Sequence, residues 1–221
     1  MKIKGLSGEN FWDYENGFYW FSDATRINKI LYHFELYKMI LNLPGDIFEF
    51  GVFKGASLIR FCQFRDTLEN NNTRKIVGFD FFGNFPTDRI KDGSDLSFIE
   101  TFEKTAGTGV TREQLSDVLQ KKGFRNFDLI QGNVFDTLDK YLQKNPELRL
   151  SLLHLDMDVA EPTQYVLDAL YHRLVKGGLI VIDDYNGVDG ATKVVDEFIQ
   201  KHNLKIEMLS FNERPVFIRK Q

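Results

Sequence analysis

The stretch that decides the fold reads Asp46-Ile47-Phe48-Glu49-Phe50-Gly51-Val52-Phe53-Lys54-Gly55-Ala56-Ser57. A short apolar run comes first, a turn with two glycines follows, and an apolar segment of helical character extends to about Leu68. A buried strand that passes through a tight turn into a helix is typical of the first half of a β-α-β unit. The stretch therefore predicts an α/β protein with a parallel sheet.

Further apolar runs follow along the chain, and most of them alternate with helical patterns. We expect strands at residues 75–80, 127–131, 150–156 and 179–183, and an antiparallel hairpin from residues 206–211 and 216–219. Helices are expected at residues 23–42, 162–174 and 191–201, and two more lie between residues 87 and 126, the second beginning with a capping box at Thr111. The pattern predicts a mainly parallel sheet of seven strands with helices on both faces.

The chain reads as a single domain over residues 1–221, with no repeat or linker. Residues 1–22 are rich in aromatics and glycine but show no regular period, so we expect an irregular arm or lid. With the helix that follows, this segment forms residues 1–42, and residues 43–221 form the predicted catalytic core.

Composition and charge exclude several classes of protein. Lys and Arg total 28 against 32 for Asp and Glu, and the net charge of −4 offers no basic field for nucleic acid or an anionic membrane. No apolar run approaches the length of a membrane span, and residues 1–8 lack the apolar core of a secretory signal. The single cysteine, Cys62, is expected to be a buried core thiol. We expect a cytoplasmic protein.

The glycine turn is the first candidate binding element. Its spacing, Glu49-x-Gly51-x-x-x-Gly55, differs from dinucleotide and P-loop motifs and disfavours a pyrophosphate cradle. The acidic residue before the glycines suits a positively charged ligand, and S-adenosylmethionine carries a sulfonium and an ammonium group. Asp80, at the end of the second strand, is placed to accept hydrogen bonds from two ribose hydroxyls. A nucleotide-dependent oxidoreductase is the rival interpretation, and NAD(H) binding would distinguish it.

Acidic residues follow two strands, at Asp156 and Asp158 and at Asp183 and Asp184. If the strands are neighbours, these carboxylates repel one another unless a cation lies between them. All-oxygen ligation favours magnesium or calcium over zinc. Because adjacent residues in a strand face opposite ways, Asp183 and Asp184 can share a metal only where the chain leaves the strand. The alternative is that these are solvated strand ends.

Residues 45–57, 78–86, 155–163 and 177–185, taken in order, resemble the macrocin/mycinamicin-type sugar O-methyltransferases. The resemblance extends from about residue 42 to residue 198. It implies the Rossmann-like class I methyltransferase fold, with S-adenosyl-L-methionine as cofactor and Mg²⁺ as an assisting ion.

The resemblance also implies roles for single residues. The cofactor would be bound at its methionine end by Glu49, Gly51, Gly55 and Ser57, at the ribose by Asp80 and near the adenine by Asn133; the metal ligands would be Asp156, Asp183 and Asp184; and the catalytic residues would be Asp156 and, as general base, Asp158. The expected partner is a sugar-containing small molecule, either nucleotide-linked or a glycosylated natural product, and the family suggests a homodimer. A catechol-like phenol as acceptor, or a non-catalytic binding module, remains an alternative.

Overall fold

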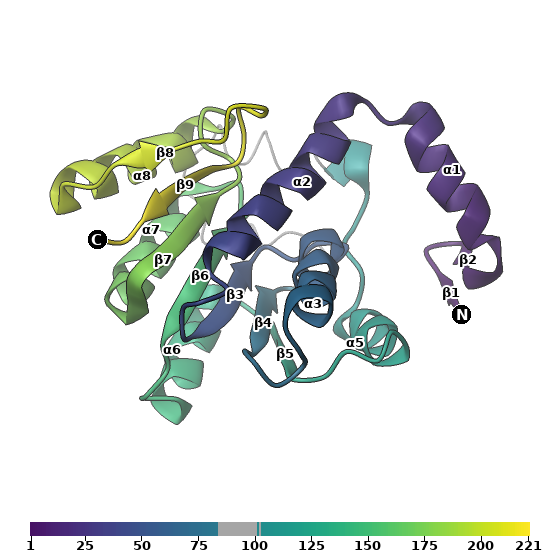
Figure 1. Ribbon diagram of the computed structural model, residues 1–221, viewed down its shortest axis with the longest axis horizontal. Coiled ribbons are helices and arrows are strands. Elements are labelled where there is room, and N and C mark those ends of the chain that lie inside the picture. Colours follow the sequence, from purple (N-terminus) through teal and green to yellow (C-terminus); the bar gives the residue numbers. More distant parts are fainter. Residues whose placement is uncertain (84–100, 102) are drawn as a thin grey trace.

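A seven-stranded sheet forms the centre of the computed structural model, which describes residues 1–83, 101 and 103–221 (Figure 1). Its strands are β3 (Asp46–Phe50), β4 (Ile76–Asp80), β5 (Phe127–Gln131), β6 (Leu150–Leu155), β7 (Leu174–Ile182), β8 (Ile206–Glu207) and β9 (Val216–Arg219). They lie in the order β5-β4-β3-β6-β7-β9-β8. Strands β3 to β7 pair in parallel, whereas β9 is antiparallel to both β7 and β8. The predicted sheet and its terminal hairpin are confirmed.

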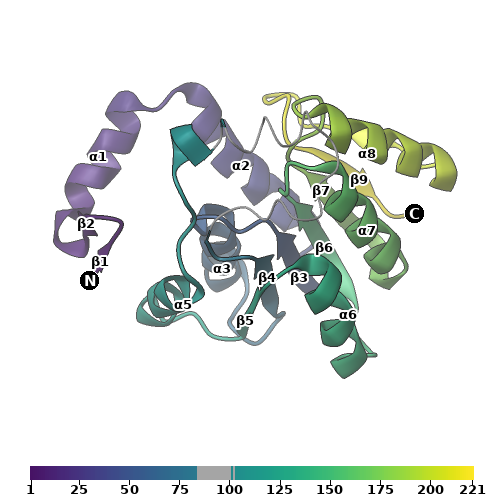
Figure 2. The same ribbon diagram turned by 180° about the vertical axis from the view of Figure 1, so that it is seen from behind.

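Helices cover both faces of the sheet, as predicted. One face carries α2 (Ala24–Met39), α3 (Ala56–Leu68) and α5 (Arg112–Lys121), which bury apolar side chains such as Leu36, Phe61 and Leu119. The other face, seen in Figure 2, carries α6 (Val134–Lys144), α7 (Ala160–Leu170) and α8 (Asp189–His202), which bury Leu138, Leu167 and Phe198. Burial on both faces explains why the central strands are continuously apolar. Cys62 is fully buried on α3, as expected.

The chain changes direction across the sheet between β3 and β6, which are neighbours although β4 and β5 lie between them in sequence. At this switch point the backbones come very close: the N–H of Asp156 donates to the carbonyl of Phe50 at 2.9 Å. Gly51 follows with φ +87°, and a Cβ built there would lie 1.8 Å from the carbonyl oxygen of Asp156. Only glycine fits this position. Ligands of open α/β sheets bind at such a switch point.

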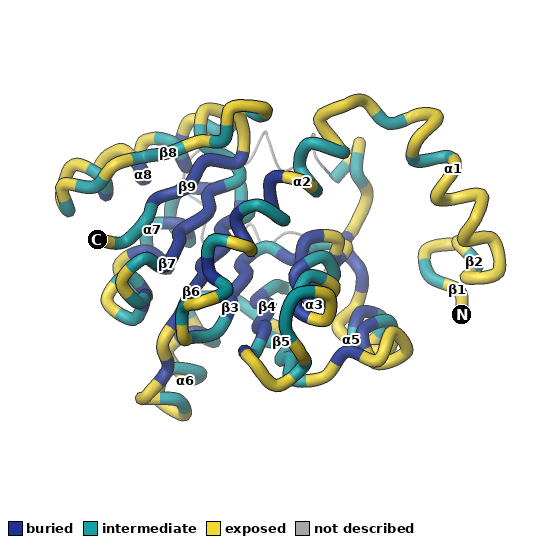
Figure 3. The backbone as a smooth tube through the Cα atoms, viewed as in Figure 1, coloured by how far each residue is buried: buried dark blue, intermediate teal, exposed yellow. Residues whose placement is uncertain are grey.

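The amino-terminal segment differs from the prediction. Residues 1–22 are not irregular: β1 (Lys2–Ile3) and β2 (Leu6–Ser7) pair antiparallel, a short 3₁₀ turn (Gly8–Asn10) follows, and Phe11–Phe21 form helix α1. Helix α1 stands away from the body and buries none of its residues (Figure 3). Phe11, Tyr14, Phe18 and Phe21 do have helical spacing, but other aromatics stand beside them, so no single apolar stripe marks the helix in the sequence.

Other element boundaries also differ. Helix α6 was not predicted, although Asn133 caps it: the Asn133 side chain accepts a hydrogen bond from the N–H of Phe135 at 3.1 Å. Strand β7 begins five residues before its predicted start, at Leu174 rather than Leu179. The capping box at Thr111 is confirmed. The first of the two helices expected between residues 87 and 126 lies mostly outside the described residues.

Candidate functional site

A cavity of about 470 Å³ lies at the carboxyl ends of the parallel strands. This volume falls within the usual range of small-molecule sites. The predicted site residues that line it are Gly51, Ser57, Asp80, Asn133, Asp156, Asp158, Asp183 and Asp184. The structure therefore brings together residues at the carboxyl ends of five different strands. Two predicted residues, Glu49 and Gly55, do not line the cavity.

Asp80 organises the glycine turn. Its Oδ2 accepts hydrogen bonds from the N–H groups of Val52 at 2.7 Å and Phe53 at 2.9 Å, and its Oδ1 accepts one from the N–H of Phe82 at 2.6 Å. The carboxylate thus joins the loops that follow β3 and β4 and faces the cavity. Each carboxylate oxygen has two acceptor positions, so Oδ1 of Asp80 retains one position for a ligand hydroxyl.

Glu49 and Gly55 lie behind the cavity wall. Glu49 is fully buried in β3, and its Oε1 accepts a hydrogen bond from the hydroxyl of Ser57, which does line the cavity. Glu49 Oε2 is buried and has no hydrogen-bond partner within the described ranges. Gly55 precedes α3 with φ +80°, and a Cβ there would lie 2.5 Å from Leu115 of α5. The close approach that requires glycine at position 55 is therefore to a side chain of the fold.

Three carboxylates form an acidic cluster at the ends of β6 and β7. Oxygens of Asp156, Asp158 and Asp184 all lie within 4.8 Å of one another, and Asp184 Oδ2 accepts a hydrogen bond from the N–H of Asp158 at 3.0 Å. Burial, together with the charge of Asp183, raises the pKa of Asp156 to about 8. Burial and the charges of Asp158 and Asp156 raise the pKa of Asp184 well above its usual value. A cation bound between these groups would remove the repulsion that raises both pKa values.

Asp183 points away from this cluster toward two basic groups. Its Oδ2 accepts a hydrogen bond from Lys29 of α2 at 2.5 Å, and Lys29 also lies 3.9 Å from Asp156. Although burial opposes ionisation, the neighbouring His154 and the charge of Lys29 hold the pKa of Asp183 well below its usual value. The two adjacent carboxylates thus diverge where β7 ends, as strand alternation requires.

His154 lies in β6 between two carboxylates, with Nδ1 3.7 Å from Glu49 Oε1 and Nε2 3.9 Å from Asp183 Oδ1. Burial lowers the pKa of His154, but these carboxylates outweigh it and raise the pKa to about 9. His154 is fully buried and lies behind the cavity wall rather than on it. His33 is also buried, stacked on Phe61 with ring centroids 5.3 Å apart.

The loops around the cavity contain unusual backbone conformations. Phe53, Phe82, Asp158 and Asn186 have φ between 53° and 64°, and each follows a different strand of the sheet. Non-glycine residues rarely adopt this region, and such residues cluster at functional sites. The backbone conformations therefore support a functional assignment to the same end of the sheet as the acidic residues.

The sequence reasoning missed three basic residues of the cavity that lie on helices. Arg26 and Lys29 come from α2 and Arg60 from α3, and all three line the cavity. Their signal was positional: Arg26, Lys29 and the buried His33 are spaced by three and four residues and share one helix face. An argument from apolar periodicity counts only the hydrophobic residues of that face.

A mainly parallel seven-stranded sheet with a terminal antiparallel hairpin, and a cavity at its switch point, define a Rossmann-like protein with the class I methyltransferase fold. The chain belongs to the macrocin O-methyltransferase (TylF) family, whose model matches residues 28–220. The resemblance seen in the sequence motifs is thereby confirmed.

Two curated relatives illustrate the family. The chain is 26% identical over 182 residues to demethyldecarbamoylnovobiocin O-methyltransferase of Streptomyces niveus, a match that covers 80% of this chain and 66% of that protein. It is 25% identical over 181 residues to mycinamicin III 3''-O-methyltransferase of Micromonospora griseorubida, covering 80% and 69%. The chain thus spans about two thirds of the length of these relatives.

Solved structures agree with the fold. The calicheamicin methyltransferase CalS11 superposes with a TM-score of 0.71 at 25% identity, covering 97% of this chain and 86% of that one. The O-methyltransferase NovP superposes with a TM-score of 0.72 at 21% identity, covering 88% and 80%. In the part of the chain that the structure describes, no helix is long and apolar enough to cross a membrane.

Proposed function

We propose that this protein transfers a methyl group from S-adenosylmethionine to a hydroxyl of a sugar, with assistance from Mg²⁺. The observation that carries the proposal is the single cavity wall on which the glycine turn and Asp80 meet the acidic cluster of Asp156, Asp158 and Asp184. The family and the relatives' names, which describe O-methylation of glycosylated natural products, support the same activity. A nucleotide-linked sugar is the other acceptor in this class.

The cofactor fits the residues of the glycine turn. Ser57 is on the wall with the buried Glu49 behind it, so this end of the cavity suits the ammonium and sulfonium of the methionine part. Asp80 faces the cavity, and its Oδ1 has one acceptor position left for a ribose hydroxyl. Asn133 lines the cavity at the start of α6, where the adenine would lie.

The acidic cluster fits a hard divalent cation, because its donors are all carboxylate oxygens. Asp156 and Asp184 belong both to the set implied by the family and to the set brought together in the structure. For the third ligand the family implies Asp183 and the geometry favours Asp158, since Asp183 binds Lys29. A bound Mg²⁺ would lower the pKa of an acceptor hydroxyl.

Asp158 would accept the proton of the acceptor hydroxyl. This carboxylate has two oxygens, so one can contact the cation while the other accepts the hydroxyl proton as a general base. Two features fix the position of Asp158 in the acidic cluster: its left-handed backbone conformation and the hydrogen bond that its N–H donates to Asp184. The protein would then hold the acceptor oxygen and the methyl carbon in line, which supplies much of the rate.

Methyl transfer from S-adenosylmethionine to a panel of nucleotide sugars and glycosides, with Mg²⁺ or with chelator, tests the proposal. We expect metal-dependent turnover that Asp156→Ala abolishes while the variant still binds S-adenosylhomocysteine. Transfer only to catechols would replace the sugar acceptor by a phenol. Binding of S-adenosylhomocysteine without turnover on any class of acceptor would favour a non-catalytic binding module. Failure to bind S-adenosylhomocysteine would refute the proposed methyltransferase activity.

A further inference from the structure

Two arginines on the cavity wall carry no partner. Arg26 lies in the first turn of α2, and Arg60 lies in the second turn of α3. Neither guanidinium makes a hydrogen bond or a salt bridge within the ranges 1–83, 101 and 103–221. Burial, and the charge of Arg26, lower the pKa of Arg60, so the two groups repel each other across the cavity edge. Because Arg60 is half-buried, an anionic group of a ligand beside it would compensate its charge and that of the more exposed Arg26.

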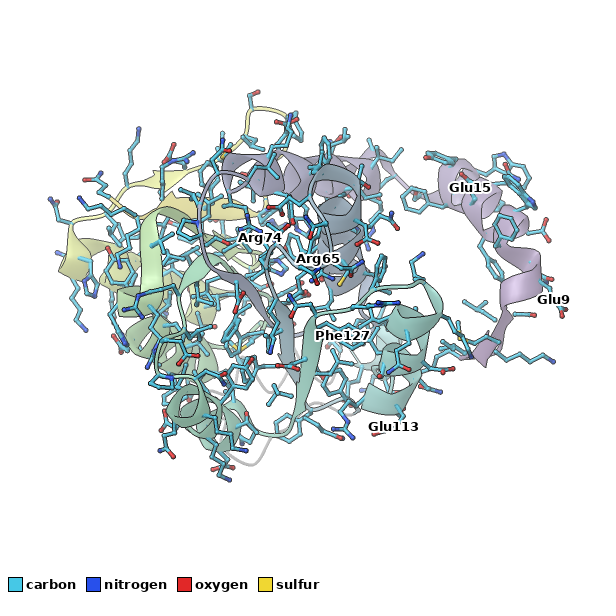
Figure 4. The ribbon with its side chains drawn as sticks, turned by 60° about the horizontal axis from the view of Figure 1, so that its bottom comes forward. Glu9, Glu15, Arg65, Arg74, Glu113 and Phe127 are labelled. Atoms are coloured by element: carbon cyan, nitrogen blue, oxygen red, sulfur yellow. The ribbon has the colours of Figure 1, made fainter. Side chains whose placement is uncertain are left out.

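Arg65 and Arg74 are buried and both have partners, although the Nε of Arg65 has none within the described residues. Arg74 binds Glu69 at 2.7 Å, and Arg65 donates to the carbonyls of Arg74 and Asn126 at 2.8 Å and 2.9 Å. Figure 4 shows Arg65 and Arg74 close together in the interior. Arg60 is half-buried and Arg26 is exposed, and both line the cavity without a partner in the described residues.

The two arginines lie where the contact between α2 and α3 reaches the cavity. Deeper in the molecule, aromatic rings make this contact. His33 stacks on Phe61, and the ring centroids of Phe34 and Phe64 lie 5.3 Å apart. One turn nearer the cavity the same faces carry Arg26 and Lys29 on α2 and Ser57 and Arg60 on α3. Lys29 is neutralised by Asp183. On these two helix faces the guanidiniums of Arg26 and Arg60 are the positive charge that remains, and Lys54 of the glycine turn, which also lines the cavity, donates to the carbonyl of Ala106 at 2.6 Å.

We propose that Arg26 and Arg60 form an oxyanion-binding site at this end of the cavity, which holds a carboxylate or phosphate group of the bound ligand. The planar guanidinium fork matches both groups. Ser57 lies one helical turn before Arg60, so the site adjoins the end assigned to the methionine part of the cofactor. The anion can come from the cofactor carboxylate or from a phosphate of a nucleotide-linked acceptor. The inference rests on the proposed function.

Calorimetric titration of the full chain and of its Arg26→Met and Arg60→Met variants tests the site. The ligands are S-adenosylhomocysteine, its decarboxylated analogue, which lacks only the carboxylate, and thymidine diphosphate. Arg112→Met is the matched control, because this exposed arginine pairs with Glu113 on α5, outside the cavity. Circular dichroism melting confirms that each variant is folded.

We expect both cavity variants to lose at least about tenfold in affinity for S-adenosylhomocysteine, the value of one charged hydrogen bond, and to bind the decarboxylated analogue unchanged. If the variants lose affinity only for thymidine diphosphate, the two arginines bind a phosphate of the acceptor rather than the carboxylate of the cofactor. Unchanged affinity of folded variants for all three ligands would overturn the site. Failure of the unmodified chain to bind either adenosyl compound would instead refute the proposed function, and the diphosphate titration would still decide the site.

Discussion

Among single residues, Gly51 has the strictest steric requirement, because a Cβ there would lie 1.8 Å from the carbonyl oxygen of Asp156. Gly123 has a similar φ, +80° against +87°, but open space around it. We expect Gly123→Ala to cost about 1 kcal/mol for the left-handed backbone alone. Gly51→Ala should cost about 3 kcal/mol more, because β3 and β6 must separate. Chemical unfolding of both variants measures the difference, and equal losses would contradict the steric account.

At the same scale, Asp158 and Asp183 compete for the third ligand position of the proposed cation site. Asp158 is within 4.8 Å of Asp156 and Asp184, whereas Asp183 binds Lys29. We expect Asp158→Asn to weaken Mg²⁺ binding at least about tenfold, the loss of one charged contact. Asp183→Asn should change Mg²⁺ affinity much less but lower the melting temperature, because Lys29 loses its partner. Calorimetry with Mg²⁺ measures both, and the reverse order would support the family's ligand set.

At the scale of elements, the sequence predicted those whose apolar pattern matches their burial. The β3 and β6 strands are continuously apolar because helices cover both faces. Helix α1 was missed because it buries nothing, so no apolar stripe at a period of 3.6 residues marks it. Helix α6 buries only Leu138, and its cap, Asn133, was interpreted as a ligand residue instead.

Helix α1 makes few contacts with the body, so its removal tests its role directly. A chain starting at Asp23 keeps the cap of α2, since the Asp23 side chain accepts a hydrogen bond from the N–H of Thr25 at 2.8 Å. We expect the melting temperature to change by less than about 3 °C, because no residue of α1 is buried. Affinity for S-adenosylhomocysteine should not change, and a rise in acceptor KM would confirm the predicted lid. A large loss of stability would show that α1 packs against the body.

For the whole molecule, the site is assembled from strand ends that lie far apart in sequence. The acidic residues were predictable, because carboxyl ends of neighbouring parallel strands must meet at one edge of the sheet. Lys29, Arg26 and Arg60 were not, because their place depends on how α2 and α3 cross that edge. Helix packing angles and helix rotation do not follow from a hydrophobic pattern alone. The positions of these three basic residues could therefore be found only from the structure.

Stability of the whole chain should depend on pH and Mg²⁺ together. Asp156, with its pKa raised to about 8, and Asp184 favour folding when protonated, so their contribution is lost as pH rises through their folded pKa values. The pKa of His154 is raised from 6.5 to about 9, so its contribution is lost between these two pH values. All three contributions have the same sign, and the metal-free protein should lose stability progressively from about pH 4, near the usual carboxyl pKa, to about pH 9.

Mg²⁺ binds the ionised carboxylates, so the stability that it adds should increase as pH rises, whereas the stability of the metal-free protein decreases. We expect the increase in melting temperature on adding Mg²⁺ to be larger at about pH 8.5 than at about pH 6.5, because protons compete with the cation at the lower pH. Asp156→Asn is the control, since it removes a ligand and a titrating group at once and should flatten the pH dependence of the Mg²⁺ effect. A Mg²⁺ effect that is equal at both pH values in the unmodified chain would mean that the cation binds outside the acidic cluster. In that case burial and the mutual repulsion of the carboxylates would remain the causes of the raised pKa values of Asp156 and Asp184, with Lys29 at 3.9 Å from Asp156 as a counter-ion.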